Sequence, residues 1–293
     1  MSQCIVVGLG SIGTAAARAL GSSMVAAVEI GPARPSLEAP IVGTIVAARA
    51  AAPGADVAVL TTSSRLHEIA PQIDEAVAHG FHVVSTCEEL SFPALYRPDL
   101  AEAIDRSATQ HGRAVIGVGV NPGFVMDFLP LAVGRACVRI DNIEVERVVD
   151  TTRRRGPLRR KVGEGMAEAE WRKLAAAGQL GHVGLAQSAA LLCAGLGWTA
   201  GKIEETLDPV VRDGVAQGLV QTASAAGGRV TLRLEMAVDA PGPRDHVRIQ
   251  GDPPIDVILP GGIHGDRGTI GTVLYAVKRV TSLAPGLRTV LDL

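Results

Sequence analysis

Cysteines, aromatic residues and long apolar runs are all scarce in this sequence, and each scarcity excludes a class of protein. The four cysteines stand far apart with no CxxC or CxH spacing, which indicates neither a disulfide framework nor a zinc site, and we expect no bound metal. No window approaches 18 uninterrupted apolar residues, so no transmembrane helix is predicted. The first residues lack the pattern of a signal peptide. We therefore expect a cytoplasmic protein that does not enter a membrane.

A surplus of positive charge is also missing. The net charge is −2, and nucleic acid as the main partner would require a basic surplus on at least one face. Apolar residues make up 47% and charged residues 20%, as in soluble globular proteins. A chain of 293 residues is long enough for two domains with a substantial core.

A glycine-rich turn follows the first predicted strand. The apolar run from Cys4 to Val7 leads into GLGSIG and then into small, helix-forming residues. In this strand, turn and helix context, GxGxxG is typical of dinucleotide binding, because the glycines permit the turn, the approach of a pyrophosphate and close packing of the helix. A purely structural turn is the alternative. The expected cofactor contacts are Gly8, Gly10, Ser11, Ile12 and Gly13.

An acid at the end of the second predicted strand bears on cofactor choice. Glu29 follows the apolar run from Met24 to Val28, where an acid usually binds the adenosine ribose and repels a 2′-phosphate. This favours NAD. Arg34 is near enough in sequence to bind a 2′-phosphate instead, so the cofactor is expected to be NAD or NADP.

Strands and helices then alternate, which predicts an α/β Rossmann domain with a parallel sheet. The expected strands are 57–60, 81–85 and 114–118, and the expected helices are 66–78 and 98–110. Ligands of such sheets lie beyond the carboxyl ends of the strands. The segments that follow those strands supply further expected cofactor contacts, namely Thr61, Thr62, Ser63, Asn121 and Pro122.

Two carboxylates, Glu88 and Glu89, stand directly after one of these strands. A carboxylate beside a nicotinamide can act as a general base or stabilise a developing cation. An iminium formed from a carbonyl group and ammonia is such a cation. The alternative is that both glutamates cap a helix that begins near Leu90.

The pattern changes after Asp127, where helices are followed by alternating strands with a Gly227-Gly228 hairpin turn. We expect residues 1–127 to form the Rossmann domain, completed by a C-terminal helix within 264–293. Residues 128–263 then form an α+β domain with a mostly antiparallel sheet, for substrate binding and dimerisation. The basic run Arg153 to Lys161 is either a solvated loop or a binding site for a substrate carboxylate.

Only eight residues are aromatic, and half of them fall in two clusters after predicted strands. Such clustering indicates an apolar pocket, although core packing requires the same residues. The expected pocket residues are Phe92, Tyr96, Phe124, Phe128, Trp171 and His182.

Several segments together resemble one family across nearly the whole chain. They are GLGSIG, VVSTCEELSFP, GVGVNPGFVMDFLPL, KVGEGM, GHVGLAQSAALLCAGLGW, IQGDPPI, GGIHGDRGT and APGLRTVLDL. The chain is similar to 2,4-diaminopentanoate dehydrogenases and native amine dehydrogenases, within a wider dihydrodipicolinate reductase-like group. The resemblance implies NAD(P)-dependent interconversion of an amine with a ketone or aldehyde plus ammonia. It also implies a glutamate of the EEL segment as acid–base residue, and a homodimer with substrate held between domains.

Two departures from that group matter: the first bears on cofactor preference, and the second argues against a true dihydrodipicolinate reductase. The segment after Glu29 is shorter than usual, and TTRRRGPLRRK replaces the HHxxKxDxPSGT type of segment of true dihydrodipicolinate reductases. The alternatives are a reductase of ring C=N or C=C bonds and a non-catalytic dinucleotide sensor.

Overall fold

The computed structural model describes residues 2–31, 35–152, 154 and 156–293. The chain forms two compact units, one comprising Met1–Phe124 with His264–Leu293 and the other comprising Val125–Ile263. The first boundary thus follows Phe124, whereas the sequence pattern placed it after Asp127. Arg34 and Arg153 lie outside the described residues.

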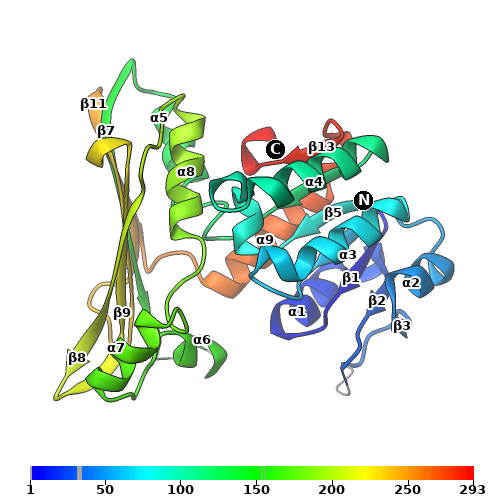
Figure 1. Ribbon diagram of the computed structural model, residues 1–293, viewed down its shortest axis with the longest axis horizontal. Coiled ribbons are helices and arrows are strands. Elements are labelled where there is room, and N and C mark those ends of the chain that lie inside the picture. The colour runs from blue at the N-terminus through cyan, green and yellow to red at the C-terminus, as the bar shows by residue number, and fades with distance from the viewer. Residues whose placement is uncertain (1, 32–34, 153, 155) are drawn as a thin grey trace. The chain divides into compact units, whose positions relative to one another are not determined.

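The first unit contains a parallel sheet of seven strands in the order β13-β6-β5-β4-β1-β2-β3 (Figure 1). This confirms the predicted Rossmann class. The short strands β3 and β13 were not expected, because each is too brief to show a periodic pattern. The strands are β1 (Cys4–Val7), β2 (Met24–Val28), β3 (Ile41–Val42), β4 (Val57–Leu60), β5 (His82–Ser85), β6 (Ala114–Gly117) and β13 (Gly286–Arg288).

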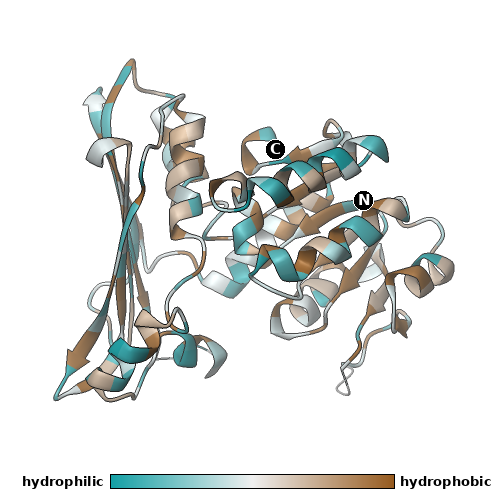
Figure 2. Cartoon of the chain, in the orientation of Figure 1, coloured by the Kyte–Doolittle hydropathy of each residue, from teal (hydrophilic) through white to brown (hydrophobic). Residues whose placement is uncertain are grey.

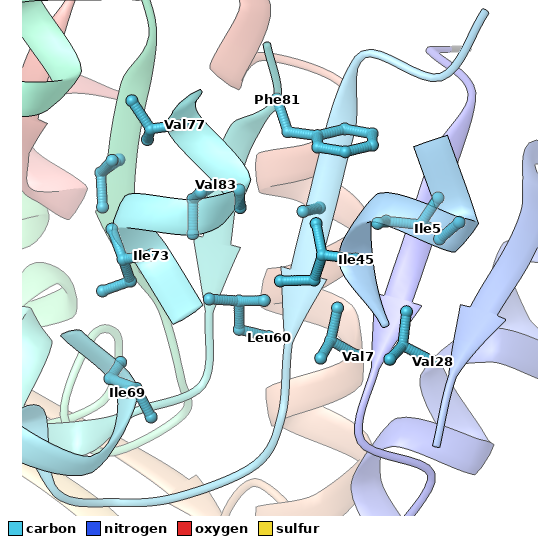
Figure 3. Packing of buried hydrophobic residues seen from close by; sticks show 14 of the residues in the cluster. Ile5, Val7, Val28, Ile45, Leu60, Ile69, Ile73, Val77, Phe81 and Val83 are labelled. Carbon is cyan, nitrogen blue, oxygen red and sulfur yellow. The ribbon is translucent and has the colours of Figure 1, made fainter. Parts of the chain in front are cut away.

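Helices cover this sheet because their apolar residues recur at helical spacing. Ile69, Ile73 and Val77 of α3 are buried and belong to the same core as Leu60 and Val83 of the sheet (Figure 3). Helix α1 packs against α9, the returning C-terminal helix. The helices are α1 (Ser11–Leu20), α2 (Ile45–Ala51), α3 (Leu66–Ala78), α4 (Pro98–Gln110) and α9 (Gly265–Val277), with 3₁₀ turns η1 (Gly21–Ser23), η2 (Glu88–Ser91), η3 (Pro93–Leu95), η5 (Val280–Ser282) and η6 (Val290–Asp292).

The second unit contains a six-stranded sheet in the order β12-β11-β7-β10-β9-β8. Only β7 and β10 are parallel neighbours, so the sheet is mostly antiparallel, as predicted. The strands are β7 (Arg139–Asp150), β8 (Glu204–Arg212), β9 (Val215–Ala225), β10 (Val230–Ala237), β11 (Arg244–Asp252) and β12 (Ile255–Pro260), and β9 joins β10 through η4 (Ala226–Gly228).

The helices of this unit are α5 (Phe128–Gly134), α6 (Gly156–Lys161), α7 (Glu168–Ala176) and α8 (Leu185–Gly195). Three of these four described helices, α5, α7 and α8, pack on the sheet of the unit (Figure 1). Helix α8 is buried over most of its length and contacts β9 and β10.

Hydrophobic residues are concentrated in the strands of the parallel sheet, whereas α3 and α4 carry both hydrophobic and hydrophilic residues (Figure 2). Within the described ranges, no helix combines the length and the apolar character needed to span a membrane.

Candidate functional site

The glycine turn between β1 and α1 brings the backbone of both elements together. A Cβ on Gly13 would lie 1.8 Å from the carbonyl oxygen of Gly8 and 2.4 Å from Thr61 Oγ1, so only glycine allows this approach. Gly8 has a φ of +85° and donates its N–H to Val28 O at 2.9 Å. A Cβ on Gly10 would meet nothing within 4 Å. In the described chain no side chain caps α1, so its first N–H groups are available for a phosphate.

The loop after β4 is tied to this turn. Thr61 Oγ1 donates to Gly8 O at 2.6 Å, which fixes the loop against the glycine turn. Thr62 Oγ1 donates to Gln72 Oε1 at 2.8 Å, and Ser63 Oγ bonds the carboxylate of Glu68. Of the three expected cofactor residues, Thr61 therefore contacts the glycine turn, while the hydroxyls of Thr62 and Ser63 contact α3.

Glu29 joins the end of β2 to the same turn. Its Oε2 accepts from the N–H of Leu9 at 2.6 Å, and its Oε1 accepts from the N–H of Gly31 at 2.7 Å. Backbone donors thus hold the carboxylate beside the glycine turn, where the adenosine ribose lies in Rossmann folds.

The segment after β6 is a tight turn closed by glycines. A Cβ on Gly119 would lie 2.7 Å from Pro122 O, and Gly123 has a φ of +118°. The Asn121-Pro122 peptide is cis, and Asn121 is 8% exposed. Val120 N donates to Thr269 Oγ1 of α9 at 3.3 Å, which ties this turn to the C-terminal helix. The pattern of the sequence gave no sign of Thr269 as a partner, because 149 residues separate the two.

The two glutamates after β5 have different surroundings. Glu89 Oε1 lies 2.8 Å from Arg65 Nη1, and Oε2 accepts from the N–H of Leu66, the first residue of α3, at 2.7 Å. The N–H of Glu89 also approaches Ser64 O at 3.4 Å. Glu89 thus caps α3 rather than a helix near Leu90. Glu88 is half-buried at the start of η2.

The thiol beside these acids is unreactive. Cys87 is 1% exposed, and burial raises the pKa of its thiol to about 12, although backbone hydrogen bonds from Leu90 and Glu89 act in the opposite direction. A thiol nucleophile requires a lowered pKa, so Cys87 is a packing residue.

The expected pocket residues are divided between the two units. In the first unit Phe92 and Phe124 are half-buried, while Tyr96 is 57% exposed. In the second unit Phe128 is half-buried at the start of α5, directly after the capping residue Asp127.

Trp171 and His182 lie in well-packed parts of the second unit. Trp171 is 1% exposed, and its Nε1 donates to Val162 O at 2.9 Å, which favours a core-packing role. Gln221 holds the backbone of His182, accepting its N–H at 2.9 Å and donating to its carbonyl oxygen at 3.1 Å. Gln221 was missed by sequence reasoning, because one buried polar residue in a strand carries no motif.

Known proteins with similar sequences or folds are dehydrogenases and reductases. The family model of the 2,4-diaminopentanoate dehydrogenase C-terminal domain matches residues 124–293. The 2,4-diaminopentanoate dehydrogenase of Acetoanaerobium sticklandii is 30% identical over 261 residues, which cover 82% of this chain and 74% of that protein.

Two solved structures share the fold. The amine dehydrogenase from Mycobacterium smegmatis has a TM-score of 0.84 at 18% identity, with 99% of this chain and 95% of that chain covered. The dipicolinate-bound dihydrodipicolinate reductase from Paenisporosarcina sp. TG-14 has a TM-score of 0.55 at 11% identity, with 100% and 99% covered. The match of the family model to more than half of the chain and the identity to the curated relative agree with the motifs described above. The protein is an oxidoreductase that belongs to the 2,4-diaminopentanoate dehydrogenase family.

Proposed function

We propose that the protein catalyses the reversible NAD(P)-dependent oxidative deamination of a primary amine to a ketone or aldehyde and ammonia. The single observation that carries the proposal is the Glu88-Glu89 pair, which follows β5 at the carboxyl edge of a parallel sheet whose first turn is GLGSIG. Ligands of such sheets lie at that edge. The names of the curated relative and of the Mycobacterium smegmatis structure support amine chemistry.

In this proposal the nicotinamide supplies hydride transfer, and the chain manages protons and charge. In the direction of amination, a glutamate takes a proton from ammonium, so that neutral ammonia can attack the carbonyl carbon. The protonated glutamate then returns this proton to the hydroxyl of the resulting carbinolamine, which leaves as water, and the restored carboxylate favours the positively charged iminium that accepts hydride. Half-buried apolar side chains around it exclude water, which competes for the C=N bond.

We assign the acid–base role to Glu88 and a positioning role to Glu89. Both carboxylate oxygens of Glu89 already hold Arg65 and the start of α3, which fixes the backbone of its neighbour. A residue that caps a helix weakens this contact when it takes up a proton, which favours Glu88 for the proton transfer.

The cofactor proposed is NAD rather than NADP, because the Glu29 carboxylate is held beside the glycine turn by two backbone N–H groups. A 2′-phosphate at that place meets a negative charge. We expect kcat/KM to be higher with NADH than with NADPH. We expect Glu29→Ser to reduce the ratio of kcat/KM with NADH to kcat/KM with NADPH. A wild-type enzyme that uses NADPH better would contradict this choice.

The substrate is proposed to be a small amine with an apolar body, contacted by Phe92 and Phe124 of the first unit. Tyr96 is more exposed than these residues, and we propose that it lies at the margin of the site. We leave Trp171 out of the site because its indole packs within the second unit.

The function is tested by following NADH oxidation with short ketones, with and without ammonium. The amine dehydrogenase proposal requires ammonium for turnover. Ammonium-independent turnover with a ring C=N or C=C substrate would instead support the reductase alternative. If the dinucleotide binds but no substrate in the screen turns over, the sensor alternative is favoured.

The assignment of roles is tested with Glu88→Gln and Glu89→Gln in parallel. We expect Glu88→Gln to lower kcat about 10²-fold or more, as removal of a general base does, with NADH affinity unchanged. Glu89→Gln should have a smaller effect on kcat and should lower stability. The reverse order of effects on kcat would transfer the acid–base role to Glu89.

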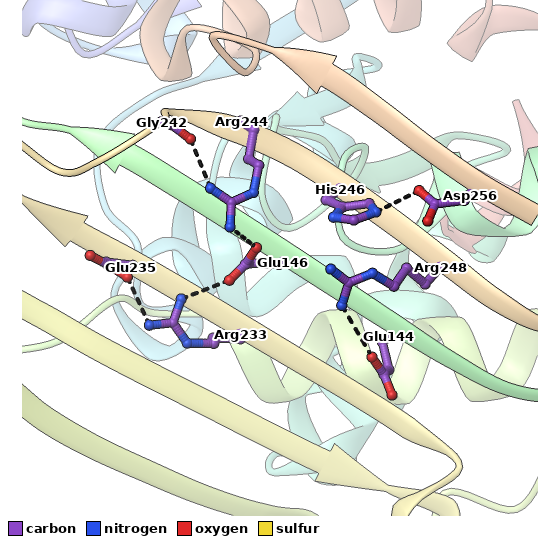
Figure 4. Close-up of polar contacts among 9 residues, drawn as sticks. All are labelled: Glu144, Glu146, Arg233, Glu235, Gly242, Arg244, His246, Arg248 and Asp256. Carbon is purple, nitrogen blue, oxygen red and sulfur yellow. Dashed lines mark hydrogen bonds and ion pairs between the residues drawn. The ribbon is translucent and has the colours of Figure 1, made fainter.

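We further propose that the protein is a homodimer that associates through the face of the second sheet opposite its helices. Charged side chains on this face pair within the chain: Glu146 bonds Arg233 and Arg244, and Asp256 lies 2.6 Å from His246 (Figure 4). Paired charges leave the face nearly neutral, so two copies of it do not repel each other when they meet across a two-fold axis.

The size of this face fits such an interface. Six strands with a spacing of about 4.8 Å and a length near nine residues cover roughly 800 Å². A standard interface buries about 800 Å² per partner.

Thr222→Arg, at a half-buried position of β9 on this face, should convert a dimer to a monomer in light scattering after size exclusion. Thr109→Arg, on an exposed position of α4, should remain dimeric. A monomeric wild type or a dimeric Thr222→Arg would contradict this interface.

A further inference from the structure

Two arginine side chains converge on Gly80, at the edge of the parallel sheet opposite the glycine turn. A Cβ on Gly80 would lie 3.6 Å from Arg113 Nη2 and 3.8 Å from Arg49 Nη2. Gly80 precedes β5 and Arg113 directly precedes β6, so this place lies at the amino ends of the strands. Apart from the chain neighbours of Gly80, these two nitrogens are the only described heavy atoms within 4 Å of the point that a Cβ would occupy.

Arg49 is held rigidly in this position. Its Nε donates to His79 O at 3.0 Å, and its Nη1 donates to Pro53 O at 3.0 Å and to Ala55 O at 2.7 Å. The guanidinium also lies 3.6 Å above the ring of Phe81. These contacts occupy Nε and Nη1 and leave Nη2 directed at the space over Gly80.

Hydrogen-bond donors outnumber acceptors around Arg113. The N–H of Ala114 donates to His82 Nδ1 at 3.1 Å, so the neutral ring carries its hydrogen on Nε2. Arg113 Nη1 lies 3.3 Å from that same Nε2, so a donor faces a donor. Arg113 Nε is buried without a hydrogen-bond partner among the described residues. A buried donor without an acceptor costs free energy, so the chain itself does not fully satisfy the Arg113 guanidinium.

The cluster also has an excess of positive charge. In the part of the chain that the structure describes, neither Arg49 nor Arg113 forms an ion pair with a carboxylate. Asp56 is the nearby acid; its field raises the pKa of Arg49, but burial and Arg113 outweigh it and lower that pKa. Burial and then Arg113 likewise lower the pKa of His82, which favours the neutral ring.

We propose that the Arg49-Arg113 pair is a binding site for a phosphate group. Two guanidinium groups supply planar N–H donors and two positive charges, which a phosphate dianion matches in both geometry and charge. The oxyanion lies over Gly80 and accepts from Nη2 of each arginine. A carboxylate offers the same kind of oxygen but only one negative charge, so it binds more weakly.

This site is separate from the proposed reaction site. The four residues of β5 lie between Gly80 and the Glu88 segment, a length of about 13 Å. Phosphate binding here depends on neither hydride transfer nor amine chemistry, so its failure would leave the proposed function untouched.

Binding is tested with inorganic phosphate on the full chain, saturated with NADH so that the glycine turn is already occupied. We expect phosphate to raise Tm in a saturable manner at constant ionic strength. Acetate should raise Tm less than phosphate does, and chloride should not change it. Arg113→Gln should weaken the apparent phosphate affinity about tenfold or more, since a hydrogen bond to a charged group is lost. Arg106→Gln, on the exposed face of α4, should bind like wild type.

A second measurement needs no variant. Histidine NMR of the wild-type protein should show the pKa of His82 rising when phosphate is added, because the anion offsets the field of Arg113. A wild type whose Tm and His82 resonance do not respond specifically to phosphate would overturn the proposal. An Arg113→Gln variant that folds and retains wild-type affinity would overturn it as well.

Discussion

The carboxylate of Glu89 lies 2.8 Å from the guanidinium of Arg65, which precedes it by 24 residues. The contact joins the loops that follow two neighbouring strands, β4 and β5. Its second oxygen caps α3 at Leu66. One side chain thus holds together the segments that border the proposed reaction site.

Loss of this cap should reduce stability. We expect Glu89→Ala to lower the free energy of unfolding by about 1 kcal/mol, the usual cost of removing a helix cap, with little added by the partly exposed ion pair. The measurement is urea unfolding followed by circular dichroism. Glu102→Ala, which removes an exposed carboxylate near Arg106 but no cap, should change stability by less than about 0.5 kcal/mol. Equal effects in the two variants would count against the cap.

Two glycines of the same turn should respond differently to alanine. Gly13→Ala forces a Cβ against the Gly8 carbonyl and should destabilise the fold. Gly10→Ala meets open space and should fold normally, yet bind NADH about tenfold or more weakly, because its Cβ occupies the approach of the pyrophosphate. Thermal unfolding and NADH fluorescence titration measure the two effects. Unchanged NADH affinity in Gly10→Ala would show that the dinucleotide does not bind at this turn.

A buried ion pair secures the end of the second unit. Arg147 and Asp245 are 5% and 1% exposed and bond each other. Arg147 donates to Ile263 O at 2.6 Å, and Asp245 accepts from Ile263 N at 2.7 Å. Arg147→Met leaves Asp245 as an uncompensated buried charge and should cost about 3–5 kcal/mol in urea unfolding. The double variant Arg147→Met/Asp245→Leu should lose less free energy of unfolding than the two single variants lose together. Additive losses would argue against direct coupling of the two side chains.

Alkaline pH should destabilise the protein through two buried thiols. Burial raises the pKa of both Cys4 and Cys87 to about 12, above the value near 8.5 of an unfolded thiol. Their contribution to stability is therefore fully present below about pH 8.5 and is lost as the pH rises toward 12. In that window, each thiol should lower the free energy of unfolding by about 1.4 kcal/mol per pH unit.

Urea unfolding at several pH values between 8 and 10.5 measures this slope. Cys4→Ala should make the plot of unfolding free energy against pH less steep, because the variant lacks the Cys4 thiol. All other titrating groups are common to both proteins. Cys137→Ala, at a partly exposed position, should leave the slope unchanged. A Cys4→Ala protein with the wild-type slope would contradict the assignment.

Most of the first unit was predictable from the sequence because its signals are local. Buried parallel strands appear as short apolar runs, and α3 repeats its apolar residues at helical spacing. The strands β3 and β13 were missed because two or three residues carry no periodicity; they exist by pairing with β2 and β6. Strand β8 was missed for a different reason: it is mostly exposed at a sheet edge and lacks an apolar face.

By itself the sequence determined the glycine turn, the order of strands and helices and the presence of two acids after β5, because backbone preference and hydrophobic spacing act between near neighbours. Only the tertiary structure decided that Glu89 caps α3, that Gln221 holds His182, and that Arg49 meets Arg113 over Gly80. Each of these contacts joins residues far apart in the chain. Which side chains meet is settled by how the strands align, and no local pattern encodes that alignment.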